Sequence, residues 1–139
     1  EALRQHRAPD RLKKAVCDMR EKMRESRCSS QTDSFDIKED RGAIVDIEFL
    51  VQYLVLQHAA TYPEIIQWTD NVRLLQSLAK TNVLDPKMAY RLRWAYLIYR
   101  SVAHRLNLRE QSTQVELQRF KHLRDLVALF WEQTFGTEP

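Results

Sequence analysis

The first half of the chain shows two different patterns of apolar residues, and each pattern predicts a helix. In residues 10–27 the apolar side chains recur every three or four positions, which places them along one side of an α-helix: Leu12, Val16, Met19 and Met23. This stripe is narrow, as in a helix that lies against other elements. Residues 43–61 are apolar around nearly the whole circumference and contain no proline or glycine, which predicts a central, buried helix.

Two carboxylates stand in the first turns of that second helix. Asp46 and Glu48 fall within the stretch GAIVDIEF, where ionised side chains are costly to bury unless they are paired or hydrogen-bonded. Positions i and i+2 of a helix point to nearly opposite sides, so the two carboxylates face different surroundings. Both lie near the unpaired amides of the helix start, which favour negative charge.

Apolar periodicity and capping residues predict three more helices in the second half. The first is capped by Thr69 or Asp70, and the second begins at Asp85-Pro86 and runs to about Leu108. The last covers about residues 113–135, with Gly136 as its C-cap. The predicted core positions of these helices are Val72, Leu75, Leu78, Ala79, Met88, Leu92, Ala95, Tyr96, Tyr99, Ala103, Leu106, Phe120, Leu123, Val127, Phe130 and Trp131.

Together these elements predict an all-α fold, a helical bundle of about five to six helices with short connections. The polar segment SSQTDSFDIKEDRG marks the main internal boundary, and within it SFDIK alternates and is predicted to be briefly extended. The predicted organisation is an amphipathic helix in residues 1–28, a loop in residues 29–42 and a helical bundle domain in residues 43–139.

Composition supports a helical protein of the cytoplasm. Two glycines in 139 residues disfavour turn-rich β folds. Cys17 and Cys28 are too few and too far apart for a metal knuckle or a disulfide scaffold, so we expect free thiols in a reducing compartment. No apolar stretch reaches the length of a membrane span and no signal-peptide pattern opens the chain, so we expect no membrane partner.

Charge and aromatic residues give no clear sign of a nucleic-acid partner. The net charge is +3, and residues 1–28 hold nine Lys or Arg against five Asp or Glu. This basic segment could contact phosphates, but a solvated helix face with pairs such as Asp18 and Lys22 is the favoured explanation. The aromatic residues near position 95 have the spacing of core residues: Tyr90, Trp94, Tyr96 and Tyr99. We therefore expect no nucleic acid among the partners.

Most catalytic motifs are absent. The sequence contains no phosphate-binding GxxxxGK[ST], no GxGxxG, no HExxH and no GxSxG. One grouping has chemical content, since Asp46 and Glu48 can pair with cations at Lys38, Arg41 or Arg100. Two interpretations stay open: a structural ion-pair network that closes the bundle, or an acidic site at a helix start.

Three segments resemble the bacterial glutamine synthetase adenylyltransferase / adenylyl-removing enzyme family. They are FDIKEDRGAIVDIEFLVQYLVLQHA, WTDNVRLLQSLAKTNVL and LRWAYLIYRSVAHRLNL, and DMREKMR before them fits as well. The resemblance covers roughly residues 15–108. The family usually has Gly-Gly where this chain has Gly42-Ala43, so a positive φ is not expected to be required at Ala43.

The resemblance implies a role for this chain in a larger enzyme. The chain looks like the C-terminal helical domain behind a nucleotidyltransferase domain, with residues 1–28 as the link. The full-length enzyme would use ATP and Mg²⁺ to transfer AMP to glutamine synthetase, and it would also remove AMP, under the control of the PII signal protein. This multifunctional enzyme regulates nitrogen metabolism. The catalytic residues and the metal ligands would lie in the preceding domain, so this chain alone should be inactive.

The resemblance also suggests which residues face the catalytic cleft. Lys38, Gly42, Asp46 and Glu48 match the specific family block, and Arg100 and His104 match a later, less specific helical motif. No catalytic residue and no metal ligand is expected within this chain. The alternative is a docking module that binds PII or glutamine synthetase without a direct role in the active site.

Overall fold

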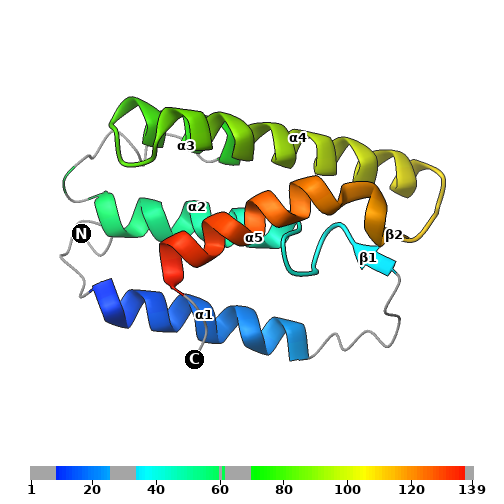
Figure 1. Ribbon diagram of the computed structural model, residues 1–139, viewed down its shortest axis with the longest axis horizontal. Coiled ribbons are helices and arrows are strands. Elements are labelled where there is room, and N and C mark those ends of the chain that lie inside the picture. The colour runs from blue at the N-terminus through cyan, green and yellow to red at the C-terminus, as the bar shows by residue number, and fades with distance from the viewer. Residues whose placement is uncertain (1–8, 26–33, 60, 62–69, 137–139) are drawn as a thin grey trace.

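The computed structural model describes residues 9–25, 34–59, 61 and 70–136. These residues form five α-helices, one short 3₁₀-helix and one pair of strands (Figure 1). The predicted helical class is confirmed. In chain order the elements are α1 (Pro9–Glu25), β1 (Ser34–Asp36), α2 (Ile44–His58), α3 (Asn71–Lys80), α4 (Pro86–Leu108), β2 (Gln114–Glu116), η3 (Leu117–Phe120) and α5 (Lys121–Phe135).

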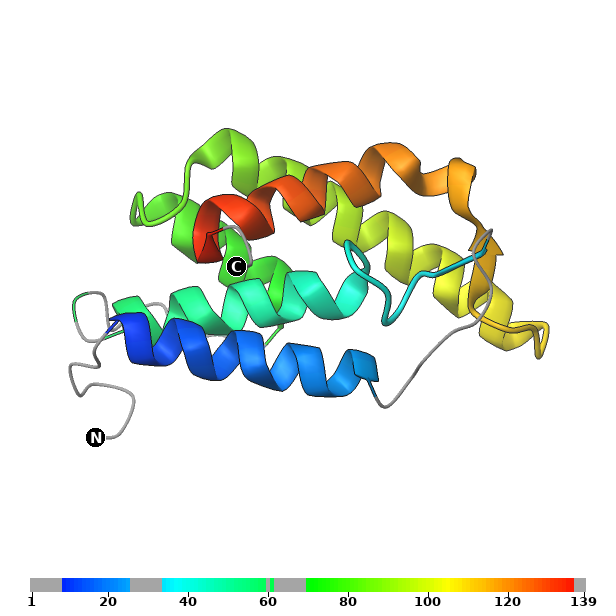
Figure 2. The ribbon, with the colours of Figure 1, turned by 60° about the horizontal axis from the view of Figure 1, so that its bottom comes forward.

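Helix α2 is the centre of the bundle. It contacts α1, α3, α4 and α5, and Figures 1 and 2 show it running beside α1. Its buried side chains point in several directions around the helix axis, as expected for a helix covered on all sides. They are Ile44, Asp46, Ile47, Leu50, Val51, Tyr53, Leu54 and Val55. The prediction of a buried central helix is confirmed, and Ala43 before it has an ordinary φ of −99°.

Helix α1 buries the first part of the predicted stripe but departs from it after Val16. Leu12 is buried and Val16 is half-buried, but Met19 is 58% exposed. Arg20 is buried instead, with only 1% of its surface exposed. Arg20 follows Leu12 and Val16 at the spacing i, i+4, i+8, so it lies on the buried face of the helix. Its ionic partner, Asp46, lies on α2. The side chain of Met23 lies outside the described residues.

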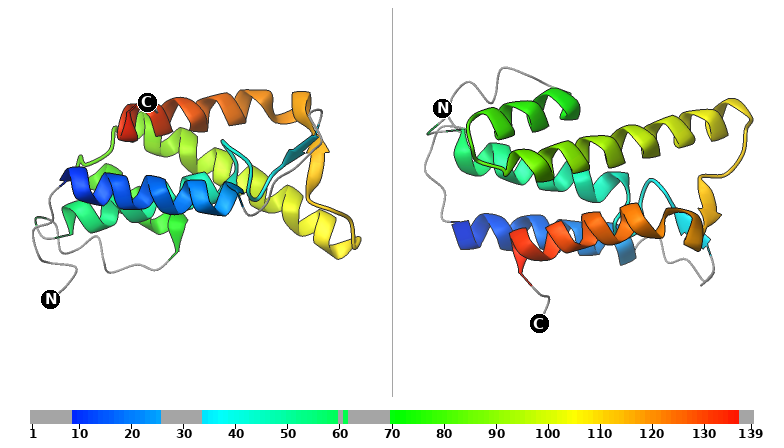
Figure 3. Two further views of the ribbon diagram at one scale, coloured as in Figure 1. Left: turned by 90° about the horizontal axis from the view of Figure 1, so that it is seen from below. Right: turned by 45° about the horizontal axis from the view of Figure 1, so that its top comes forward.

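The helix starts at α3 and α4 follow the sequence signals closely. Asp70 accepts a hydrogen bond from the backbone N–H of Arg73 at 2.9 Å, so Asp70 caps α3. Thr69, the other candidate, lies outside the described residues. Helix α4 begins with Pro86 and ends at Leu108 as predicted, although the Asp85 side chain makes no capping hydrogen bond. Helices α3 and α4 pack against each other (Figure 3).

The prediction of a last helix from residue 113 is wrong over its first turns. Residues 114–116 form strand β2, which pairs antiparallel with β1 so that Val115 lies opposite Phe35. The 3₁₀-helix η3 follows, and α5 begins only at Lys121. A distant strand partner therefore overrides the local helical pattern. The predicted extension within SFDIK is confirmed. The end of α5 is also confirmed, because Gly136 has φ +85° and its N–H donates to the Glu132 carbonyl at 2.7 Å.

An aromatic cluster joins the β1 strand to α4 and η3. The ring centroid of Tyr99 lies 6.0 Å from that of Phe35 and 6.0 Å from that of Phe120, and all three side chains are buried. Most predicted core positions of the last three helices are buried. The half-buried exceptions are Val72, Ala79, Met88, Leu106, Leu123 and Trp131. In the described part of the chain, no helix is both long and apolar enough to cross a bilayer.

A candidate pocket between the start of helix α2 and helix α4

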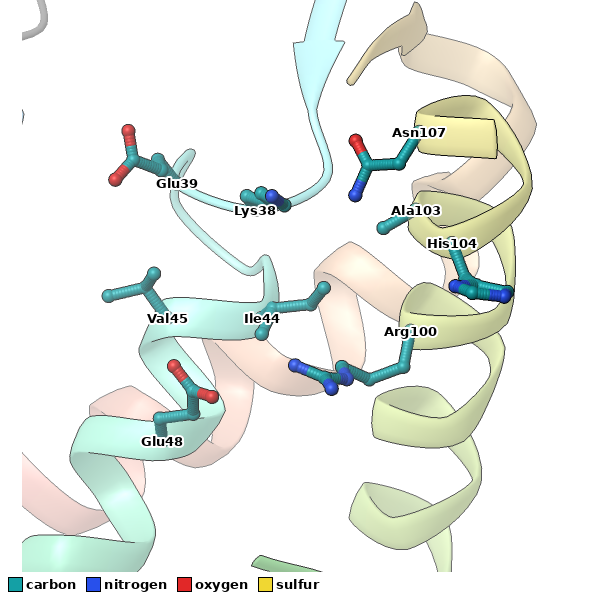
Figure 4. A pocket seen from close by; sticks show the side chains of 9 residues that line it. All are labelled: Lys38, Glu39, Ile44, Val45, Glu48, Arg100, Ala103, His104 and Asn107. Carbon is teal, nitrogen blue, oxygen red and sulfur yellow. The ribbon is translucent and has the colours of Figure 1, made fainter. Parts of the chain in front are cut away.

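A pocket of about 300 Å³ lies between the turn after β1, the first turns of α2 and the second half of α4. Four of the six predicted site residues line it, namely Lys38, Glu48, Arg100 and His104. In Figure 4, Arg100 extends from α4 across the pocket toward α2, where Glu48 lies. The other lining residues are Glu39, Ile44, Val45, Ala103 and Asn107.

The pocket carries exposed cations on two sides. Lys38 on the turn and Arg100 on α4 are both exposed, while Glu48 is half-buried. Within the described ranges, no ion pair joins Glu48 to Lys38 or to Arg100. The two cations and His104 are therefore available to groups outside this chain.

Glu48 is held by a tyrosine of α4 instead. The Tyr96 hydroxyl donates to a Glu48 carboxylate oxygen at 3.3 Å, and it accepts from the Asn71 amide at 3.2 Å. Burial raises the pKa of Tyr96 above its ordinary value, so the hydroxyl keeps its proton at neutral pH and remains a donor. The Arg100 guanidinium lies 5.8 Å from the centre of the Tyr96 ring, within the range of a cation–π contact. These contacts fix one acidic wall of the pocket.

Asp46 lies beneath the pocket rather than in it. Its side chain is 1% exposed, and its carboxylate forms an ion pair with the equally buried Arg20 of α1. Its second oxygen accepts from the backbone N–H of Gly42 at 2.7 Å. Asp46 is therefore shielded from water in this chain, and α1 supplies the cation that a buried carboxylate needs.

Gly42 is required by its position at the turn into α2. Its φ is +83°, a conformation that L side chains rarely adopt. An added Cβ would lie 2.6 Å from Cγ and 2.7 Å from the carbonyl oxygen of Arg124 on α5. The Gly42 carbonyl also accepts a hydrogen bond from the buried Tyr99 hydroxyl at 2.9 Å. Gly42 thus brings the turn against both α4 and α5.

Arg20 is a buried residue of this region that sequence reasoning missed. Besides Asp46, its guanidinium donates to the Glu39 carbonyl and, at 3.3 Å, to the Asp40 carbonyl. It therefore connects α1 to the turn that forms one wall of the pocket. The available signal was its spacing, since Arg20 falls eight residues after Leu12 and four after Val16, in line with the buried stripe.

Asp36 and Asp40 also stabilise the turn between β1 and α2. One Asp36 oxygen accepts from the Lys38 backbone N–H and from the Thr113 hydroxyl, both at 2.9 Å. Asp40 accepts from the Asp36 backbone N–H at 2.8 Å. The Lys38 carbonyl in turn accepts from the Val45 N–H at 2.9 Å, which seats the turn on the first residues of α2. The position of Lys38 is thereby fixed by its backbone.

Arg41, considered as a partner of the two carboxylates, is exposed and instead lies 3.8 Å from Glu21 of α1. As for metals, the described residues bring together no group of three or more His, Cys, Asp or Glu side chains that could hold an ion.

Comparisons with known proteins identify the family of this chain. Residues 11–134 match the family model described as GlnD PII-uridylyltransferase. A relative from Hahella chejuensis, a bifunctional glutamine synthetase adenylyltransferase/adenylyl-removing enzyme, is 40% identical over 139 residues, which cover 96% of this chain. The chain spans only 14% of that relative's length. The resemblance seen in the sequence is confirmed, and the chain belongs to the GlnD PII-uridylyltransferase family of nucleotidyltransferases.

Proposed function

We propose that this chain is the C-terminal helical domain of an enzyme that adenylylates and de-adenylylates glutamine synthetase. The enzyme is proposed to use ATP and Mg²⁺ bound by a preceding nucleotidyltransferase domain, and to act under the control of the PII protein. In this proposal the chain does not carry out the chemistry itself. Its pocket between α2 and α4 faces the catalytic domain and completes the active site.

The observation that carries this proposal is the gathering of predicted residues in one pocket. Lys38 and Glu48 come from one family block, Arg100 and His104 come from another about sixty residues later, and all four line the same cavity. Gly42 and Asp46, the other two, support that cavity from beneath. A binding site needs a rigid support of this kind behind the side chains that contact its ligand.

The chemistry of the pocket fits a supporting role in phosphoryl-type transfer. Catalysis of such transfers depends mainly on positioning and on the neutralisation of negative charge. Lys38 and Arg100 offer two cations on opposite walls, and Glu48 offers a carboxylate that can pair with a cation of the adjoining domain. We propose that these side chains orient the interface between the two domains so that the nucleotide lies in line with its acceptor.

The test uses the full-length enzyme with Lys38→Ala, Arg100→Ala and Glu48→Gln. We expect each variant to lower kcat for adenylylation by about 10- to 100-fold, the usual range for a misplaced active-site group. Lys80→Ala on α3 removes an exposed cation outside the pocket and serves as the matched control. Normal kcat in all three pocket variants would overturn the active-site role.

A second measurement separates the two activities that the comparisons suggest. The family model is described by uridylyl transfer to PII, and the relative is named for adenylyl transfer on glutamine synthetase. We expect the full-length enzyme to label glutamine synthetase from ATP and to leave PII unlabelled with UTP. Labelling of PII from UTP would instead assign the protein to the uridylyltransferases.

A further inference from the structure

Positive charge is concentrated in the two helices that follow residue 70. Residues 71–109 contain eight Lys or Arg and one Asp, a net charge of +7, whereas all other residues together contain fourteen Lys or Arg and eighteen Asp or Glu, a net charge of −4. Helix α4 alone has five basic residues and no acidic residue. The charge of the fold is therefore strongly uneven, although the net charge of the whole chain is small.

The outer face of α4 also exposes large apolar side chains. Of the six large hydrophobic residues exposed in the described part of the chain, four belong to α4: Tyr90, Trp94, Leu97 and Leu108. Trp94 is 48% exposed, and its ring packs edge-on against that of Tyr90 with 6.1 Å between the centroids. Exposed apolar side chains that cluster on one helix mark interaction surfaces.

These apolar residues and several of the cations share one side of the helix. Positions three, four, seven or eleven apart lie on the same face, and eight of the exposed residues of α4 follow this spacing. We call them the outer face of α4. Its members are Lys87, Tyr90, Arg91, Trp94, Leu97, Ser101, Arg105 and Leu108, all exposed. The inner side of α4 packs against α2, α3 and α5 (Figures 1 and 3).

We infer that the outer face of α4 is the docking surface for a protein partner with an acidic surface, which in the proposed function is glutamine synthetase. Trp, Tyr and Arg dominate the energetics of protein interfaces, and this face combines all three. Opposite charges on the two partners also accelerate their encounter. The two exposed leucines beside these aromatic residues favour a protein partner over a nucleic acid, whose bases stack mainly on aromatic rings and whose phosphates pair with cations.

The inferred surface borders the pocket without forming part of it. Arg100 and His104 line the pocket, whereas Arg91, Trp94 and Arg105 belong to the outer face of the same helix. A partner bound on this face is therefore held beside the residues proposed to complete the active site. This arrangement would present the acceptor to the catalytic domain.

The test is the steady-state kinetics of the full-length enzyme with Arg91→Glu/Arg105→Glu, and separately with Trp94→Ser. We expect the KM for glutamine synthetase to rise at least about tenfold in each, while kcat and the KM for ATP change less than about twofold, because only uniform binding is lost. Added salt should raise the KM of the wild type more than that of the charge-reversed variant. Circular dichroism of each variant checks that the fold is intact.

Matched controls lie on other helices. Arg11→Glu/Lys22→Glu reverses two exposed charges on α1, and Leu129→Ser removes an exposed apolar side chain on α5. Both should leave the KM for glutamine synthetase within about twofold of the wild type. An unchanged KM in the α4 variants, or an equal rise in the controls, overturns the inference. Two further results would also overturn the inference. One is that the α4 variants lose regulation by PII while their KM for glutamine synthetase is unchanged. The other is that DNA inhibits the wild type competitively and no longer inhibits the α4 variants.

The inference rests on the proposed function, but the two can fail separately. A full-length enzyme that does not label glutamine synthetase at all refutes the proposed function. An active enzyme whose pocket variants lose kcat, but whose α4 variants bind glutamine synthetase normally, refutes only the docking surface.

Discussion

At the scale of single residues, position 42 requires glycine because of its positive φ and its close contact with Arg124. We expect Gly42→Ala to destabilise the chain by about 3 kcal/mol or more, because it combines a left-handed backbone with a collision against Arg124. Gly136→Ala is the matched control, since Gly136 has nearly the same φ, +85°, but an added Cβ there meets nothing within 4 Å. Its cost should be smaller, on the order of 1–3 kcal/mol, because only the backbone strain remains. Urea denaturation measures both, and equal losses would show that the Arg124 contact has little weight.

The Arg20–Asp46 pair gives a second prediction at this scale. Either Arg20→Met or Asp46→Asn leaves one buried charge without its partner, and we expect each to cost about 3–5 kcal/mol. The double variant should cost clearly less than the sum of the two, because it removes both charges together. A double-mutant cycle of unfolding free energies measures this. Additive losses would mean that the two side chains are not coupled.

The same pair shows the limit of sequence reasoning about residues. The sequence showed that Asp46 needed a partner and offered Lys38, Arg41 and Arg100, all of them near it in the sequence or in a matching motif. The partner is Arg20, on a helix that was expected to be amphipathic with an apolar stripe. A buried arginine is rare, so a pattern of apolar spacing does not count it. The sequence does name Glu48 and Arg100 together, because each belongs to a recognised family block, and both line the pocket.

At the scale of elements, the two predicted N-caps provide a matched pair. Asp70 accepts a hydrogen bond from the Arg73 N–H, whereas the Asp85 side chain makes no capping bond. We therefore expect Asp70→Ala to cost about 1 kcal/mol and Asp85→Ala only a few tenths. Thermal melts of the two variants check this. A larger loss at Asp85 would contradict the capping geometry.

Helix α2 ends in a histidine whose charge the fold disfavours. Burial lowers the pKa of His58 below its ordinary value, and this outweighs the attraction that a helix C-terminus exerts on a cation. The folded state thus prefers neutral His58, and the stability that this group contributes is lost as the pH falls below about 6.5. Urea melts at pH 7.5 and 5.5 should show this loss, and His58→Gln should reduce it. An unchanged pH dependence in that variant would exclude His58 as the cause.

Element boundaries agree with the prediction where the signal is local, and they differ from it where they depend on a distant partner. The start of α4 at Pro86 and the end of α5 at Gly136 depend on the conformations of a proline and a glycine, which a sequence displays directly. Strand β2 depends on pairing with β1, about eighty residues earlier. No local pattern in residues 113–120 reports such a partner, so their apolar spacing was interpreted as the first turns of a helix.

At the scale of the whole molecule, we expect this chain alone to lack adenylyltransferase activity. The sequence has no phosphate-cradling loop, and the described side chains gather no set of metal ligands. Incubation with labelled ATP, Mg²⁺ and glutamine synthetase should leave the synthetase unlabelled, with the full-length enzyme as the positive control. Labelling by the pure chain would place the chemistry within these helices and contradict the proposed function.

The burial of Arg20 also decides how this protein can be shortened. The polar segment after residue 28 looks like a natural cutting point in the sequence, but a chain that began there would retain Asp46 and lose the cation enclosed with it. Expression of residues 29–139 should therefore yield an aggregation-prone product, whereas a synthetic peptide of residues 9–25, added in trans, should restore a cooperative melt. The smallest independent unit of this protein thus includes its first helix.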